Sequence, residues 1–130
     1  MIRTDTSSNL TKVSDLLQVI SPEVRLEILL AIGAGEACVC HLEASLGYRQ
    51  AYISQQLMAL REAGLLSTRR DGKYIYYRLE KPEIMEMVDL ATRLSGFDVS
   101  GITAKVNHAK AECECPKCST QKDNHGVKHV

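Results

Sequence analysis

The residues with the most distinctive chemistry in this sequence are five cysteines, which fall into two groups. Cys38 and Cys40 lie one residue apart in the stretch "ACVCH", whereas Cys113, Cys115 and Cys118 form "ECECPKCS" near the end. Thiolates bind soft ions such as Cd(II), Pb(II) and As(III), and they also exchange reversibly with disulfides. Two clusters of thiols therefore indicate either a site for a soft metal or metalloid ion or a thiol-redox switch.

The rest of the composition favours reduced thiols. The N-terminal stretch "MIRTDTSSNLTKVSDLLQVI" lacks a signal-peptide pattern, and no run of about eighteen apolar residues occurs. We therefore expect a cytoplasmic protein without membrane contact, in a compartment that keeps thiols reduced. A length of 130 residues with 45% hydrophobic side chains suits one globular domain. We place this domain at residues 1–98 and a flexible cysteine-rich tail at 99–130.

The spacing of Cys38 and Cys40 restricts the backbone that could use both. On a regular helix, residues i and i+2 point about 200° apart, whereas in an extended chain they share a side. The pair precedes a short predicted helix at about 41–46, which ends at Gly47. A helix start departs easily from regular geometry, and its amides lower the pKa of a thiol. One ion could bind both sulfurs there, and gathering them would distort the start of this helix.

Hydrophobic periodicity predicts the elements around the cysteine pair. Apolar stripes at helical spacing predict helices at 10–20 and 22–32, and another over "RQAYISQQLMALREAG" that Gly64 ends. Ser21 is expected to cap the second helix. The period changes to 2 in "LLSTRRDGKYIYYRL", where Asp71-Gly72 signals a tight hairpin, and the tyrosines there are expected to be packing groups. A last helix follows from Pro82 to about Gly96.

Charge is sorted along the chain although the net charge is zero. Residues 49–78 contain six basic and two acidic side chains, whereas residues 79–100 contain two basic and five acidic ones. A basic middle segment of this kind favours one face that meets a polyanion such as DNA.

The predicted order of elements is that of a winged helix, in which a hairpin follows a helix-turn-helix. The stretch "EACVCHLEASLGYRQAYISQQLMALREAGLLSTRRDGKYIYYRL" (36–79) resembles the core of the ArsR/SmtB family of metal-responsive repressors. This likeness covers 10–95 in element order. We therefore expect a mainly α fold with a β-hairpin, a winged helix-turn-helix of order α-α-α-α-β-β-α. The resemblance also implies a homodimer formed by the first and last helices.

A recognition helix presents polar residues near its start to base edges in the major groove, while wing residues meet phosphates or the minor groove. The expected DNA-binding residues are Arg49, Gln50, Ser54, Gln55, Arg69, Arg70 and Lys73. Among these, Gln50 and Gln55 are expected to recognise bases, because glutamine can bond adenine in a bidentate way. The partner is then double-stranded DNA with an inverted-repeat operator, because a two-fold dimer binds two half-sites.

The resemblance also bears on the ligands of the ion. Family members with this thiol pair often complete the site from an N-terminal arm, but residues 1–37 contain no cysteine. We therefore expect the tail to supply the missing donors. The predicted metal site comprises Cys38, Cys40, Cys113, Cys115 and Cys118. Its expected inducers are As(III), Cd(II) and Pb(II), ahead of Zn(II).

Histidines are expected to contribute little to this chemistry. The family's second site on the last helix uses Asp and His, and here Asp89 has no histidine between Leu42 and Asn107. We therefore expect no such site. The histidines are expected to be surface residues, with His41 the best candidate for a ligand because it adjoins Cys40. These histidines are His41, His108, His125 and His129.

Other uses of the thiols stay open. In a redox or persulfide switch, Cys38 or Cys40 would form a reversible bridge with a tail cysteine. In a zinc-binding interaction module, "CECPKC" would fold a tail knuckle without affecting DNA. Because no nucleophile, base and pocket are legible together, we expect no enzyme.

Overall fold

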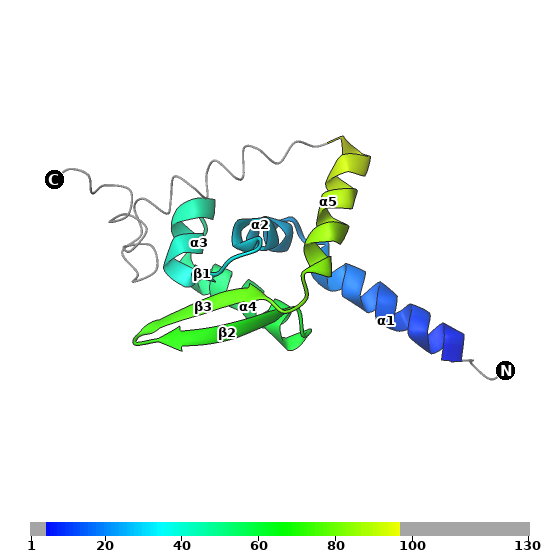
Figure 1. The fold of residues 1–130 in the computed structure, drawn as a ribbon, viewed down its shortest axis with the longest axis horizontal. Helices are drawn as coiled ribbons and strands as arrows, with labels where there is room; N and C mark the ends of the chain where they lie inside the picture. The colour runs from blue at the N-terminus through cyan, green and yellow to red at the C-terminus, as the bar shows by residue number, and fades with distance from the viewer. Residues whose placement is uncertain (1–4, 97–130) are drawn as a thin grey trace.

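The structure is a computed structural model that describes residues 5–96 (Figure 1). The predicted boundary at residue 98 and the whole tail therefore lie outside the described residues. The elements within 5–96 are α1 (Asp5–Ile20), α2 (Glu23–Ile32), β1 (Ala37–Cys38), α3 (Val39–Leu46), α4 (Gln50–Glu62), β2 (Leu66–Asp71), β3 (Tyr74–Leu79) and α5 (Glu83–Ser95).

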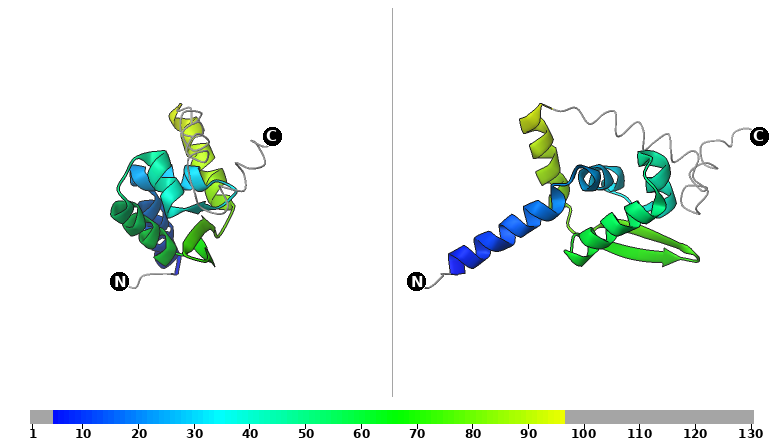
Figure 2. Two further views of the ribbon diagram at one scale, coloured as in Figure 1. Left: turned by 90° about the vertical axis from the view of Figure 1, so that its left-hand side faces the viewer. Right: turned by 180° about the vertical axis from the view of Figure 1, so that it is seen from behind.

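Helices and sheet are arranged as a winged helix-turn-helix, which confirms the predicted fold class. Helices α2, α3 and α4 form the body, and the strands form an antiparallel sheet of order β1-β3-β2. The β2–β3 hairpin extends from one end of the molecule and α1 projects from the opposite end (Figures 1 and 2). The hairpin is the wing.

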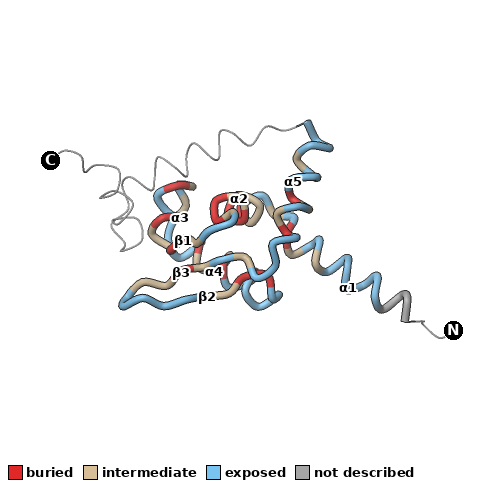
Figure 3. Tube along the Cα trace, viewed as in Figure 1, coloured by how far each residue is buried: buried red, intermediate tan, exposed pale blue. Residues whose placement is uncertain are grey.

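The core lies where α2, α4 and the base of the sheet meet (Figure 3). The inward faces predicted for the second helix and the recognition helix are confirmed as fully or nearly fully buried. These core residues are Val24, Ile28, Ala31, Ile32, Ile53, Leu57 and Leu60. Burial of this shared stripe holds the recognition helix against α2, because each buried aliphatic side chain contributes about 1.5–3 kcal/mol relative to exposure.

Local details differ from the sequence predictions at three places. Helix α1 begins at Asp5 rather than at residue 10. Ser21 does not cap α2: its hydroxyl donates to the carbonyl oxygen of Gln18, and Pro22 occupies the N-cap without a side-chain bond. In the hairpin, Asp71 pairs with Tyr74, so the two-residue loop begins at Gly72, whose φ of 63° suits its first position.

Two helices leave large apolar side chains on the surface. Helix α1 exposes half or more of three side chains at helical spacing, and α5 exposes two on the side away from buried Ile84 and Val88. These exposed residues are Leu10, Val13, Leu17, Leu90 and Leu94. Stripes of this kind mark surfaces that another molecule covers. None of the described helices is long and apolar enough to cross a membrane.

Candidate functional site

The thiol pair is formed where a strand becomes a helix. Cys38 ends β1 and is also the N-cap of α3, with an extended backbone at φ −90° and ψ 165°. Cys40 lies in the first turn of α3, and its Sγ is 2.7 Å from Sγ of Cys38. The extended residue therefore brings two sulfurs at spacing i and i+2 to one side, as a shared ion requires.

The environment of this pair combines burial with a backbone donor. Cys38 is 2% exposed, whereas Cys40 is half-buried. The backbone N–H of His41 donates to Sγ of Cys38 at 3.3 Å. A donor at a helix N-terminus stabilises negative charge on a sulfur and so offsets part of the cost that burial imposes on a thiolate.

The sheet extends the thiol site toward the wing. Cys38 pairs with Tyr76 of β3, and Tyr76 is 1% exposed. Cys38 and Tyr76 form a small core cluster of their own, against which Cys40 and Tyr74 pack. The packing role predicted for the tyrosines is met most fully at Tyr76, which covers the thiol pair from the sheet side.

Two predictions about ligands have different outcomes. The expectation that His41 lies at the surface is wrong, because it is 1% exposed; its place in α3, facing the core beside Leu42, buries it. The tail donors Cys113, Cys115 and Cys118 lie outside the described residues, as do His108, His125 and His129. Within residues 5–96, no three His, Cys, Asp or Glu side chains are grouped closely enough to hold a metal ion.

The polar side of α4 carries the predicted base-reading residues. Arg49 is the N-cap of α4, Gln50 and Gln55 are exposed, and Ser54 is half-buried. All four therefore lie at the N-cap or in the first half of the helix, and Gln55 lies on the side away from its buried stripe. Tyr52, with 42% of its surface exposed, joins them there.

Three hydrogen bonds that sequence reasoning missed hold this helix and its neighbours in place. The hydroxyl of Tyr48 donates to the carboxylate of Glu27 at 2.7 Å. Arg25 donates from Nε to the side-chain oxygen of Gln56 at 2.8 Å and from Nη1 to the carbonyl oxygen of Val19 at 2.9 Å. Because the partners lie up to 31 residues apart, no local sequence pattern could have revealed them.

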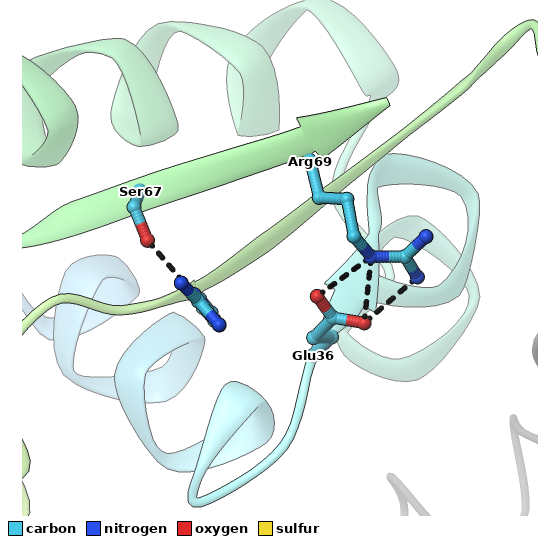
Figure 4. A network of polar contacts seen from close by, with 4 residues as sticks. Glu36, Ser67 and Arg69 are labelled. Carbon is cyan, nitrogen blue, oxygen red and sulfur yellow. Dashed lines mark hydrogen bonds and ion pairs between the residues drawn. The ribbon is translucent and has the colours of Figure 1, made fainter. Parts of the chain in front are cut away.

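The three basic residues predicted for the wing fall into different environments. Arg70 and Lys73 are exposed near the tip. Arg69 is exposed as well, but it forms a bidentate ion pair with Glu36, at 2.9 Å between Nη2 and Oε1 (Figure 4). Glu36 raises the pKa of Arg69, mainly through this hydrogen bond. The structure therefore sets Arg69 apart from the other two.

Comparison with known proteins agrees with this arrangement. The family model described as "Bacterial regulatory protein, arsR family" matches residues 22–68. The chain is 38% identical over 103 residues to the arsenical resistance operon repressor of Escherichia coli (strain K12), a match that covers 75% of this chain and 86% of that protein.

Two further relatives extend the comparison. Over 89 residues, the chain is 38% identical to the biofilm growth-associated repressor of Xylella fastidiosa, covering 68% of this chain and 78% of that protein. The fold of the present chain matches that of a homodimeric winged helix-turn-helix DNA-binding domain from Mycobacterium bovis, with a TM-score of 0.64 and 25% identity. That match covers 74% of this chain and 90% of the other.

Proposed function

Because this chain belongs to the ArsR family of DNA-binding transcription factors, which are not enzymes, we propose that it is a repressor whose operator is released by a soft ion. The inducer in this proposal is As(III), Cd(II) or Pb(II), with Zn(II) less favoured, bound by cysteine thiolates. The similarity to an arsenical resistance operon repressor supports As(III) as the first ion to test.

The observation that carries this proposal is the position of the two sulfurs. Sγ of Cys38 and Sγ of Cys40 lie 2.7 Å apart at the start of α3. Two thiolates held by one tetrahedral zinc ion at about 2.3 Å each are about 3.8 Å apart. Binding of a shared ion therefore needs no large search for the second sulfur, but it must separate the two sulfurs further than they are now.

The remaining ligands would come from the tail. As(III) is satisfied by three thiolates and loses its hydroxyl groups as water when each thiol gives up its proton. The pair at the start of α3 would supply two of these thiolates, and Cys113, Cys115 or Cys118 would supply the third, from the same subunit or from the partner. Cd(II) and Pb(II) would use the same sulfur-rich set.

Separation of the two sulfurs gives a physical route to DNA release. Cys38 is held in β1 by pairing with Tyr76, whereas Cys40 lies in α3. Helix α3 must therefore take up much of the movement, and only the turn at Gly47, Tyr48 and Arg49 separates it from the recognition helix. Release needs a coupling free energy of about 1–3 kcal/mol between the thiol and DNA sites, or about 5-fold to 150-fold in affinity.

On the DNA side, α4 would lie in the major groove. Gln50, Ser54 and Gln55 would meet base edges, and Arg49 would meet phosphate. The exposed wing residues Arg70 and Lys73 would contact phosphate or the minor groove, a role that the sequence alone also predicts for Arg69. A two-fold dimer would read an inverted repeat with half-sites about 34 Å apart.

A second copy of the chain is the partner that the exposed stripes on α1 and α5 would meet. The groove between α2 and α5, about 610 Å³ in volume, is lined partly by Leu26, Leu30 and Ala91, which adds apolar surface beside α5. The similar domain from Mycobacterium bovis is a homodimer. Pairing α1 and α5 across a two-fold axis would bury these surfaces and set the spacing of the two recognition helices.

A redox or persulfide-responsive repressor of the same fold is the second candidate, and the short sulfur separation favours it as well. An oxidant that takes two electrons from two thiols would leave a disulfide and two protons. The sulfurs of Cys38 and Cys40 are close to each other, so either could form the disulfide. A tail cysteine would be its partner in the bridge that the sequence predicts. The redox switch needs two thiols, whereas the metalloid site uses three or more.

One titration tests both candidates. The reduced full-length protein on a labelled duplex from its own upstream region is followed by fluorescence anisotropy during addition of arsenite, Cd(II) or a persulfide donor. The metalloid proposal expects release by arsenite or Cd(II) that a dithiol chelator reverses, and no release from the Cys38→Ser, Cys40→Ser double variant. Release from that variant contradicts it, and release by the persulfide donor alone supports the redox switch.

A further inference from the structure

Three residues on adjacent strands form a line from the thiol pair to the wing. Cys38 of β1 pairs with Tyr76 of β3, and Tyr76 pairs with Arg69 of β2. Side chains at paired positions share one face of a sheet and touch their neighbours. Accordingly, buried Tyr76 packs against Cys38, and the guanidinium carbon of Arg69 lies 4.6 Å from the centre of the Tyr76 ring.

Glu36 makes a second connection between the same arginine and the thiol strand, which is the segment 36–38 that includes β1. Its carboxylate accepts from Nε of Arg69 at 3.0 Å and from Nη2 at 2.9 Å (Figure 4). Glu36 lies two residues before Cys38, so both interactions of Arg69 lead back to the segment that carries this thiol. The side chain of Glu36 is only 16% exposed, which restricts where its carboxylate can go.

From this geometry we propose that Arg69 is a positioning residue that connects the thiol strand to the wing, and that it does not contact DNA phosphate. Its charge is already balanced by Glu36, and its planar face is occupied by Tyr76. A phosphate would have to compete with both interactions for this guanidinium, whose side chain is 48% exposed. Arg70 is exposed at the next position of β2, where side chains point to the opposite face, and no ion pair to another residue of 5–96 would have to be broken there.

The connection also gives the inducer a second route to DNA, and this part rests on the proposed function. An ion that separates the sulfurs of Cys38 and Cys40 strains the pairing of β1 with β3. Arg69 contacts both strands of that pairing or their ends, because Tyr76 is a paired residue of β3 and Glu36 directly precedes β1. The base of the wing therefore shifts together with the start of α3, so that the ion acts on both DNA-binding elements at once.

The salt dependence of DNA binding tests the assignment without any inducer. Removing one side chain that neutralises a phosphate reduces the slope of log K against log salt by about 0.9. We expect Arg69→Gln to keep the wild-type slope and Arg70→Gln to reduce it by about 1.8, because a dimer loses one phosphate contact from each subunit. Equal reductions in these two neighbouring variants overturn the assignment, because Arg69 would then neutralise a phosphate as Arg70 does.

The coupling is tested by Cd(II) titration of the full-length protein, with the thiolate-to-metal absorption band recorded beside DNA anisotropy. Glu36→Ala and Arg69→Gln should each reduce the Cd(II)-driven decrease in DNA affinity by about twofold to fivefold, the range expected for a partly exposed ion pair. The double variant should match either single variant, because the two residues act as one unit. The absorption band should be unchanged in all of them.

Ser67→Ala is the matched control. Ser67 accepts a hydrogen bond from Nε of Arg78 at 3.1 Å on the same two strands, apart from the pair of Arg69 and Glu36 (Figure 4). This variant should keep both the wild-type slope and the wild-type release. A wild-type release in Glu36→Ala overturns the coupling. A full absorption band without release from the wild-type protein overturns the proposed function and the coupling together, whereas the salt slopes still decide the role of Arg69.

Discussion

Tyr48 and Glu27 join the turn before the recognition helix to α2 through a hydrogen bond of 2.7 Å. The Tyr48 ring also lies 5.4 Å from the ring of Tyr52, on the exposed side of α4. Two interactions of Tyr48 therefore hold the start of the recognition helix: the hydrogen bond to Glu27 of α2 and the ring contact with Tyr52 of α4.

Replacing Tyr48 by Phe should lower the free energy of unfolding by about 1 kcal/mol, because the half-buried carboxylate of Glu27 loses this donor. Urea denaturation followed by circular dichroism measures the change. Tyr52→Phe is the control, since Tyr52 is 42% exposed and its hydroxyl has no such carboxylate partner among residues 5–96. Equal losses in the two variants would show that the bond to Glu27 contributes nothing.

Tyr48 should lose its phenolic proton at a higher pH than an ordinary tyrosine. Its pKa is raised to about 12, first by the hydrogen bond to Glu27 and then by burial. The neutral phenol is the form favoured by folding, so this contribution to stability is full below the ordinary pKa of 10.0 and is lost as the pH rises through about 12. Phenolate absorbance should therefore include a late tyrosine transition that Glu27→Gln shifts toward lower pH. A titration curve that this substitution leaves unchanged contradicts the assignment.

The tail cysteines should matter for the response and not for DNA binding itself. Simultaneous replacement of Cys113, Cys115 and Cys118 by Ser should abolish release by arsenite, because As(III) would be left with two thiolates. Operator affinity without inducer should stay within about twofold, because none of the proposed DNA-contacting residues is changed. An intact arsenite response in this triple variant would show that the ion is held without the tail.

The two DNA-binding elements should differ in what they recognise. Gln55→Ala should weaken operator binding by about 1–3 kcal/mol for each half-site while hardly changing affinity for unrelated DNA, because it removes a base contact in each. Lys73→Gln should weaken binding to both duplexes and reduce the salt slope by about 1.8, because each subunit of the dimer loses a phosphate contact. Anisotropy titrations on operator and scrambled duplexes measure both. Similar behaviour of the two variants would contradict this division.

Dimerisation should depend on the exposed apolar side chains of α1 and α5. Leu17→Glu and Leu94→Glu should shift sedimentation toward the monomer, since burying an unpaired carboxylate in an apolar interface is costly. Both leucines are at least half exposed in the single chain, so the fold of each subunit should be retained. Met58→Glu is the matched control, because Met58 is 60% exposed on α4, a helix outside the proposed α1 and α5 interface. Equal dissociation in all three variants would argue against the α1 and α5 interface.

Elements that depend on neighbours within a few turns could be predicted from the sequence. Stripes such as Ile53, Leu57 and Leu60 specify which face of a helix is buried, and Gly47 and Gly72 specify where the chain must turn. Their information is local, because helical spacing and positive φ are properties of short segments. The winged-helix order, the thiol pair and the polar face of α4 all follow from patterns of this kind.

The connections between these elements depend instead on the tertiary structure. Two contacts join segments that are far apart in the sequence, namely the pairing of Cys38 with Tyr76 and the ion pair of Arg69 with Glu36. The burial of His41 depends on a core that several elements build. A basic residue on a predicted wing looks the same in sequence whether it faces phosphate or a carboxylate 33 residues away. Its partner is chosen by sheet register, which depends on packing of the whole domain.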